Sequence, residues 1–145
     1  MIRKAKDTDT ETLIAIWLRG NIQAHDFIPA EYWTKHIEYM HDALGKADIT
    51  VYEADGQAVG FAGMGGNHIA GIFVDDKYRS QGIGSRLINH LKQRHDKLTL
   101  CAYEKNRRAV SFYLRKGFIV TKSGTDNNTG ETEITMEYHK DKEAS

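Results

Sequence analysis

The chain has 145 residues, and its 20 Lys and Arg side chains balance 20 Asp and Glu, so its formal net charge is zero. This balance excludes a protein that holds nucleic acid through bulk positive charge, and it excludes a polybasic protein of the membrane surface. The longest unbroken apolar run spans residues 13–18, far short of the roughly 18 residues that indicate a membrane span. We therefore expect neither nucleic acid nor a membrane as a partner.

The single cysteine, Cys101, excludes an intrachain disulfide, so the fold must depend on a packed core. The N-terminus has no apolar signal segment, and together these features predict a cytoplasmic protein. No repeat or composition shift divides the chain, so we expect one domain over residues 1–145, with a frayed polar tail at 140–145. No pattern supplies a base for Cys101, which is expected to be a small buried apolar residue and not a nucleophile.

The spacing of apolar residues and the turn signals predict a mixed α/β (α+β) protein. Apolar residues recur at helical spacing over residues 13–18 and alternate with polar ones over residues 132–138. Asp55-Gly56 between two β-rich runs predicts a hairpin. The expected strands are residues 2–5, 49–54, 57–62, 68–74, 98–103, 118–120 and 132–138. The expected helices are residues 9–20, 29–44, 84–95 and 106–116. The order β-α-α-β-β-β-α-β-α-β-β favours a mixed, mostly antiparallel seven-stranded sheet flanked by about four helices.

The stretch from residue 74 to residue 85 combines the end of a strand, a glycine-containing turn and the start of a helix. Unpaired N–H groups and the positive end of the helix dipole favour an anion at such a place. Glycines let the backbone approach a ligand closely, and Arg79 adds a charged donor. Taken alone, Arg-x-x-Gly-x-Gly is equally compatible with an ordinary turn whose glycines permit tight packing.

Two segments carry a resemblance to a known family. Arg79-Ser80-Gln81-Gly82-Ile83-Gly84, after the strand Ile72-Phe73-Val74, resembles the acetyl-CoA-binding motif of the GNAT N-acetyltransferase superfamily. Residues 106–118, with the pattern Asn-x-x-Ala-x-x-Phe-Tyr-x-x-x-Gly-Phe, resemble that family's second hallmark. Both stand in the family's order and at its usual separation, and the element order is similar over nearly the whole chain. The sequence most resembles the small bacterial single-domain members.

The resemblance implies the GNAT acyl-CoA N-acyltransferase fold and an acetyl-CoA-dependent enzyme without a metal. The acetyl group would pass from acetyl-CoA, as co-substrate, to a primary amine by direct attack in a ternary complex. The acceptor would be a small molecule or a peptide. The cofactor-binding residues implied are Ile72, Phe73, Val74, Arg79, Ser80, Gln81, Gly82, Ile83, Gly84, Ser85, Asn106 and Tyr113.

Two side chains are candidates for proton transfer. The resemblance implies that Tyr113 is the general acid for the departing thiolate; the alternative is a core aromatic on the inward helix face. His68 is the tentative base, since several family members carry Glu or His at this offset from the motif; the alternative is a strand histidine with a structural hydrogen bond. Other members place a catalytic Glu five residues before the motif Asn, and here that position is Cys101.

The acceptor site is expected near His25, Phe27, Trp33 and His68, because the family's acceptor site borders this first-half segment. The alternative is that Phe27 and Trp33 only join helices to the sheet. A basic cluster surrounds the last helix and suits the phosphates of CoA, or else is a solvated helix face. Its members are Lys105, Arg107, Arg108, Arg115 and Lys116, with Arg79 and Arg86 nearby.

Two other functions stay open at this stage. One is a non-catalytic sensor or regulatory module that binds acetyl-CoA or CoA. The other is an acetyltransferase acting on charged tRNA, which the zero net charge disfavours. We expect a monomer or a homodimer, the latter formed through the edge of the last strand.

Overall fold

The computed structural model describes residues 1–140. Most of the predicted tail lies outside these residues, whereas the Lys140 N–H donates to the Asp96 carbonyl at 2.7 Å. The strands are β1 (Ile2–Lys4), β2 (Asp48–Ala54), β3 (Gln57–Gly65), β4 (His68–Val74), β5 (Lys97–Tyr103), β6 (Ile119–Thr125) and β7 (Thr132–His139). The helices are α1 (Thr10–Ala24), α2 (Ala30–Thr34), α3 (Ile37–Lys46), α4 (Ile83–Arg94) and α5 (Arg107–Arg115), with 3₁₀ turns at Asp7–Asp9 and Asp76–Tyr78.

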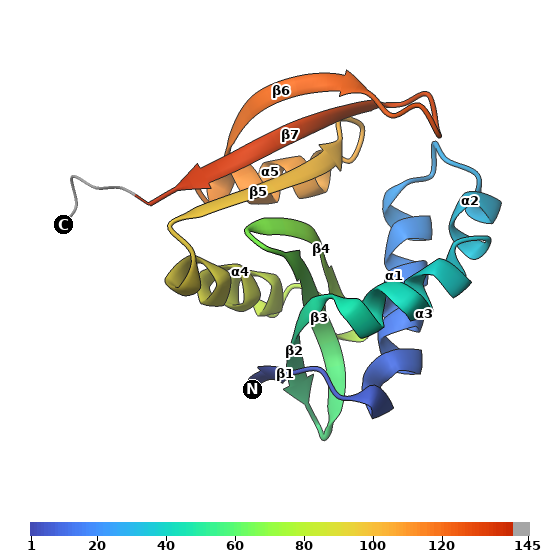
Figure 1. Ribbon diagram of the computed structural model, residues 1–145, viewed down its shortest axis with the longest axis vertical. Coiled ribbons are helices and arrows are strands. Elements are labelled where there is room, and N and C mark those ends of the chain that lie inside the picture. Colours follow the sequence, from blue (N-terminus) through green and yellow to red (C-terminus); the bar gives the residue numbers. More distant parts are fainter. Residues whose placement is uncertain (141–145) are drawn as a thin grey trace.

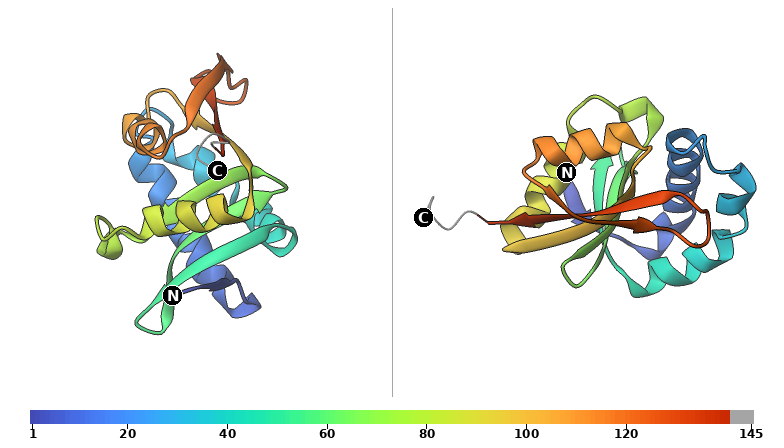
Figure 2. Two further views of the ribbon diagram at one scale, coloured as in Figure 1. Left: turned by 90° about the vertical axis from the view of Figure 1, so that its left-hand side faces the viewer. Right: turned by 90° about the horizontal axis from the view of Figure 1, so that it is seen from above.

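The strands form one sheet in the order β1-β2-β3-β4-β5-β7-β6 (Figure 1). Every neighbouring pair is antiparallel except β4 and β5. Helices α1 to α3 lie on one side of the sheet and α4 and α5 on the other (Figure 2). This confirms the mixed, mostly antiparallel sheet that was predicted, with five helices in place of about four. The middle seven residues of β3 are all buried, because both faces of this strand are covered.

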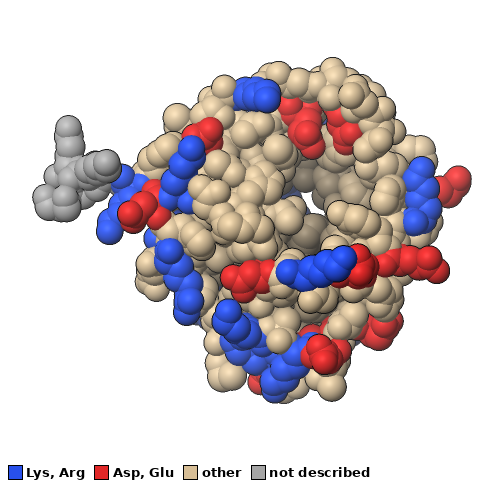
Figure 3. Space-filling view, in the orientation of Figure 1, with Lys and Arg blue, Asp and Glu red and all other residues tan. Residues whose placement is uncertain are grey.

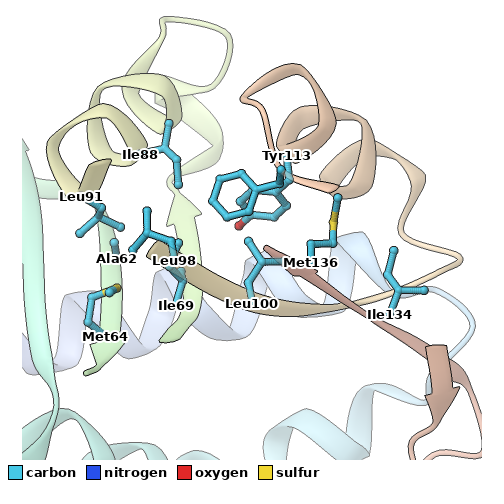
Figure 4. Packing of buried hydrophobic residues seen from close by; sticks show 11 residues of the cluster. Ala62, Met64, Ile69, Ile88, Leu91, Leu98, Leu100, Tyr113, Ile134 and Met136 are labelled. Carbon is cyan, nitrogen blue, oxygen red and sulfur yellow. The ribbon is translucent and has the colours of Figure 1, made fainter. Parts of the chain in front are cut away.

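The core on the α4 and α5 side joins strands from both halves of the sheet. Ile88 and Leu91 of α4 meet Leu98 and Leu100 of β5, and Tyr113 of α5 packs in the same cluster (Figure 4). On the opposite side a second cluster joins α1 to β2 and β3. Leu114 of α5, next to Tyr113 in the sequence, is 50% exposed.

The prediction that the first helix ends at Gly20-Asn21 is wrong, because α1 continues to Ala24. Gly20 serves a close approach of helix and strand: a Cβ there would lie 3.4 Å from Cδ1 of Phe73 in β4. The Asn21 amide donates to the Trp17 carbonyl at 2.9 Å and so fits inside the helix. The last turn of α1 therefore reaches the mouth of the candidate site.

The single helix predicted over residues 29–44 is two helices, α2 and α3, with a break at Lys35 and His36. The His36 N–H turns to the carbonyl of Trp33, three residues back. Its ring Nδ1 lies 2.5 Å from the carbonyl of Tyr32, the group that an unbroken helix would pair with that N–H. The side chain thus competes with the backbone and ends the helix.

Two expectations about the C-terminal strands are also corrected. Strand β7 lies between β5 and β6, so both its edges are occupied and it offers no edge to a partner. Cys101 is exposed, not buried. Leu98 and Leu100 of β5 face the core, and Cys101, the next residue along the strand, points to the other face.

Candidate active site

The sheet opens between β4 and β5, the one parallel pair of strands in the described part of the chain. Strands β4 and β5 pair at His68 with Thr99 and at Ile69 with Leu100, and then they diverge. A cavity of about 650 Å³ lies at this opening, and Ile72, Phe73 and Val74 line it from β4. Because this part of β4 has no ladder partner on the β5 side, its backbone groups there are available to an extended ligand.

The charged side chains of the cavity wall are all basic. Five basic side chains line it: Arg79, Lys105, Arg107, Arg108 and Arg115. Among the described residues, no Asp or Glu lines this cavity. A wall that carries cations and no carboxylate suits a polyanion, and CoA carries a pyrophosphate and a 3′-phosphate.

The turn between β4 and α4 forms a concave run of backbone N–H groups. Ser80 has φ +64° and Gly82 has φ +81°, so two nearly adjacent residues adopt the left-handed conformation. For Ser80 this conformation costs about 1–2 kcal/mol. Gly82 precedes the 12-residue helix α4, whose first N–H groups have no intrahelical partner. Such a turn at a helix start is an anion-binding arrangement.

Arg79 belongs to a network of three polar side chains that includes Gln23 of α1. Its Nε lies 3.1 Å from Oδ1 of Asp76, and its Nη2 donates to Oε1 of Gln23 at 3.0 Å. The Gln23 amide in turn donates to Oδ2 of Asp76 at 2.7 Å. This contact ties the last turn of α1 to the loop after β4, across the cavity that Gln23 and Arg79 both line.

Tyr113 reaches the cavity from the inner face of α5. It is 8% exposed and lines the cavity, and its burial raises the pKa of the phenol well above its usual value. Within the described part of the chain its hydroxyl forms no hydrogen bond. A neutral phenol with a free O–H is equipped to donate a proton.

Asn106 and His25 form one hydrogen-bonded unit at the cavity wall. Asn106 precedes α5, and its Oδ1 accepts from the Ala109 N–H at 3.2 Å. Its Nδ2 lies 3.2 Å from Nε2 of His25, whose Nδ1 lies 3.0 Å from the Asn21 carbonyl. Burial lowers the pKa of His25, so the neutral ring predominates. Both residues line the cavity, together with Asn21.

His68 stands at the closed end of the opening. It is exposed, and its Nδ1 lies 2.8 Å from Oγ1 of Thr99. Thr99 alternates with the core residues Leu98 and Leu100, so His68 and Thr99 lie on the face away from α5. Glu133 of β7 is close by: burial and Asp126 raise the pKa of its carboxyl, and His68 opposes that rise. In Figure 3, acidic side chains lie at the upper rim of a hollow on this face.

The other two predicted acceptor residues lie behind the cavity wall. Phe27 and Trp33 do not line the cavity and instead surround the His25 ring, with Trp33 stacked at 5.2 Å and Phe27 edge-on at 5.6 Å between ring centroids. Trp33 is buried, and within the described residues its Nε1 has no hydrogen-bond partner. Their roles toward an acceptor stay predictions.

Most of the predicted cofactor residues come together around the one cavity. The lining includes Ile72, Phe73, Val74, Arg79, Ser80, Gly82, Ile83, Gly84, Ser85, Asn106 and Tyr113, but not Gln81. The last turn of α1 also lines it, through Gly20, Asn21, Gln23 and Ala24. The sequence did not predict this turn because the helix was expected to end at Gly20; the polar side chains of Asn21 and Gln23 were the available signal.

A smaller cavity of about 330 Å³ adjoins the first along α1. Its wall carries both signs of charge, with Glu11, Asp75 and Asp76 beside Arg19 and Arg79. Carboxylates on the wall make it a poor phosphate site. Among residues 1–140 no group of three or more His, Cys, Asp or Glu side chains is arranged to hold a metal, and no helix there is long and apolar enough to cross a membrane.

Known proteins that are similar to this chain identify its family. Residues 14–140 match the model of the acetyltransferase (GNAT) domain. The chain belongs to the GNAT acetyltransferase family. This GNAT protein is 36% identical over 131 residues to the peptidyl-lysine N-acetyltransferase YiaC of Escherichia coli K12, covering 89% of this chain and 90% of YiaC. It is 37% identical over 122 residues to the peptidyl-lysine N-acetyltransferase YjaB of the same strain, covering 83% and 82%.

Solved structures agree with the family. The solution structure of apo-form YjaB from Escherichia coli matches this GNAT protein with a TM-score of 0.86 and 31% identity, over 97% of this chain and 98% of the other. An acetyltransferase of Bacillus anthracis in complex with acetyl coenzyme A matches with a TM-score of 0.60 and 28% identity, over 66% and 63%. The protein is thus an acetyl-CoA-dependent N-acetyltransferase of the GNAT family, as the two motifs predicted.

Proposed function

We propose that this enzyme transfers the acetyl group of acetyl-CoA to the side-chain amine of lysine in a peptide or protein, by direct attack in a ternary complex. The observation that carries the cofactor assignment is the cavity at the sheet opening, whose wall holds five basic side chains and no carboxylate among the described residues. Two relatives at 36% and 37% identity that are named peptidyl-lysine N-acetyltransferases support the acceptor class.

The residues present fit acetyl-CoA from one end to the other. The turn with Ser80 and Gly82 in the left-handed conformation suits the pyrophosphate, and the basic side chains of α5 suit the 3′-phosphate. The unpaired edge of Ile72 to Val74 suits the amide groups of an extended pantetheine arm. When bound, acetyl-CoA supplies an activated thioester, whose sulfur leaves once the amine has attacked the carbonyl carbon.

In this proposal the acid and the base act from opposite faces of the sheet. Tyr113, on the α5 side, donates its proton to the departing thiolate. His68, on the other face, takes the proton of the attacking amine, directly or through one water. With its Nδ1–H donated to Thr99, the ring keeps a lone pair on Nε2 for this task. Attack and departure then proceed on separate sides of the opening.

The acceptor side of the enzyme is complementary to a lysine. The face that holds His68 also holds Glu133, whose position on β7 pairs with Tyr103 of β5. The Tyr103 hydroxyl donates to Asp126 at 2.5 Å. The acidic side chains at the upper rim of the hollow in Figure 3 would attract an ammonium group, and the base would then convert it to the neutral amine that attacks.

A panel of acceptors tests the proposal. Acetylation is followed by mass spectrometry on a lysine peptide with a blocked N-terminus, the same peptide with its lysine already acetylated, a lysine-free peptide with a free α-amine, and spermidine. We expect turnover of the first peptide only. Turnover of another amine alone refutes the lysine assignment, and tight acetyl-CoA binding without any turnover indicates a sensor.

A second measurement tests direct attack. Enzyme incubated with acetyl-CoA alone is expected to gain no acetyl group, and Cys101→Ser is expected to keep full turnover. A stable acetyl-enzyme that passes its acetyl group to the peptide contradicts direct attack.

A further inference from the structure

We propose that His25 is a positioning residue for cofactor binding: its ring holds the Asn106 amide in the one orientation that both caps α5 and presents the amide at the cavity wall. The inference rests on the acetyl-CoA site of the proposed function, and it is independent of which amine accepts the acetyl group.

A continuous chain of hydrogen bonds supports this role. The Asn106 Oδ1 accepts from the Ala109 N–H at 3.2 Å, and its Nδ2 faces Nε2 of His25 at 3.2 Å. The other ring nitrogen, Nδ1, lies 3.0 Å from the Asn21 carbonyl at the end of α1. The bonds agree with one tautomer only, because a ring that donates through Nδ1–H accepts at Nε2. The end of α1 is thereby joined to the start of α5 across the cavity.

The His25 ring has little freedom to turn. It is 8% exposed, stacks on Trp33 at 5.2 Å, and meets Tyr103 and Phe27 edge-on at 5.2 and 5.6 Å. Rings from α2, β5 and the segment after α1 therefore surround it. A ring fixed in this way orients Asn106 without requiring contact with the cofactor itself.

Each alternative orientation of Asn106 loses a bond. A flipped amide turns Nδ2 toward the Ala109 N–H, so the helix cap becomes a donor–donor contact. The same flip turns Oδ1 toward Nε2 of neutral His25, which is an acceptor–acceptor contact. Protonation of His25 places an N–H against Nδ2, and Asn106 can relieve that contact only by flipping and giving up the cap.

If His25 has this role, its protonation lowers the affinity for acetyl-CoA, so the affinity depends on pH. The pKa of His25 lies below 6.5, because burial disfavours the charged ring. The charged and titratable groups on neighbouring elements are Tyr103 behind the ring, Asp126 bonded to Tyr103, and Lys105 over Phe27. The phosphates of CoA also titrate near pH 6, so the dependence is read as a difference between variants.

The test is the dissociation constant of acetyl-CoA, measured by calorimetry without any acceptor. His25→Phe keeps an aromatic ring for stacking but removes both nitrogens, and we expect its affinity to fall at least tenfold, which corresponds to about 1.4 kcal/mol. His25→Gln returns an acceptor to Asn106 and is expected to recover most of that loss at pH 7.5. It should also lose less affinity between pH 7.5 and 5.5 than the wild type does.

His36→Phe is the matched control. His36 makes the same local contact, from ring Nδ1 to the carbonyl four residues back, but it lies outside the cavity wall. We expect wild-type affinity for acetyl-CoA. In the background of Asn106→Ser, which keeps a helix cap but removes Nδ2, His25→Phe should cause no further loss.

Two results overturn the inference. One is wild-type affinity in a folded His25→Phe protein. The other is an equal loss in His25→Phe, His25→Gln and His36→Phe, which marks a general effect on folding. Absence of turnover with every amine affects only the proposed function, since acetyl-CoA binding is measured without an acceptor.

Discussion

The ring of Phe73 occupies the space that a side chain at Gly71 would need: a Cβ on the glycine would lie 2.7 Å from Cζ of the phenyl ring. The same ring packs on Phe61 with 5.3 Å between centroids and lines the cavity. The ring also faces Gly20 of α1, where a Cβ would lie 3.4 Å from its Cδ1, so Gly71 is the glycine whose missing side chain leaves room for the ring.

Gly71→Ala is therefore expected to displace Phe73. We expect a folded protein destabilised by about 1–3 kcal/mol in urea unfolding, as for other overpacked sites, with a severalfold higher KM for acetyl-CoA. The matched control is Gly65→Ala, because a Cβ on Gly65 meets nothing within 4 Å. Unchanged values for both properties in Gly71→Ala contradict the assigned role of Phe73.

Tyr113→Phe is expected to lower kcat by about 100-fold, at the low end of the effect of a general acid, with little change in the KM for acetyl-CoA. The melting temperature should not fall, because the hydroxyl forms no hydrogen bond within residues 1–140. Its raised pKa predicts that Tyr113 causes no loss of kcat up to about pH 10. Tyr39→Phe, at a residue 67% exposed, is the control. Wild-type kcat in Tyr113→Phe removes this residue from proton transfer.

Asp9→Asn is expected to cost about 2 kcal/mol of stability at pH 7, because the part-buried Arg3 loses its bidentate partner at 2.8 and 2.9 Å. Arg3 holds the pKa of Asp9 below its usual value near 4. The charged pair therefore stabilises the fold above about pH 4, and that contribution is lost as the pH falls through the lowered pKa.

Urea unfolding at pH 7 and at pH 3 measures this difference. The difference in the free energy of unfolding between the wild type and Asp9→Asn should be smaller at pH 3 than at pH 7. Asp42→Asn breaks the exposed pair with Lys46 at 3.1 Å and should cost less than about 0.5 kcal/mol at either pH. Equal costs for the two variants at pH 7 refute a special role for Arg3 and Asp9.

Cys101 is expected to react with a thiol reagent in the native protein. Its side chain is exposed on β5, so about one equivalent should be modified at the same rate with and without denaturant, at a pH where the thiolate forms. A thiol that reacts only after unfolding means that the exposed face of β5 is covered in solution.

Predictions from short sequence patterns were correct where residues close together in the chain determine the structure. The turn at residues 79–84 and the pattern at residues 106–118 predicted the fold and the cofactor, and both segments line the cavity, whereas the last turn of α1 was not predicted to do so. Asn106 caps α5 as its sequence position implies, because a capping amide bonds a backbone N–H only three residues away.

At three other places the tertiary structure determined what the local sequence did not predict. Gly20 is typical of a helix end, yet α1 continues past it to Ala24 and packs there close to Phe73 of β4. Cys101 reads as a core residue, yet the alternation of β5 turns it to the open face. His25 was expected at the acceptor site; the fold brings its ring to the side chain of Asn106, 81 residues further along the chain, a partner that the sequence did not indicate. The sequence by itself determined the phosphate-binding turn and the capped start of α5, because both depend on residues that are close together in the chain. The opening of β4 from β5 and the partners of His25 depend on distant segments meeting, so only the folded chain determines them.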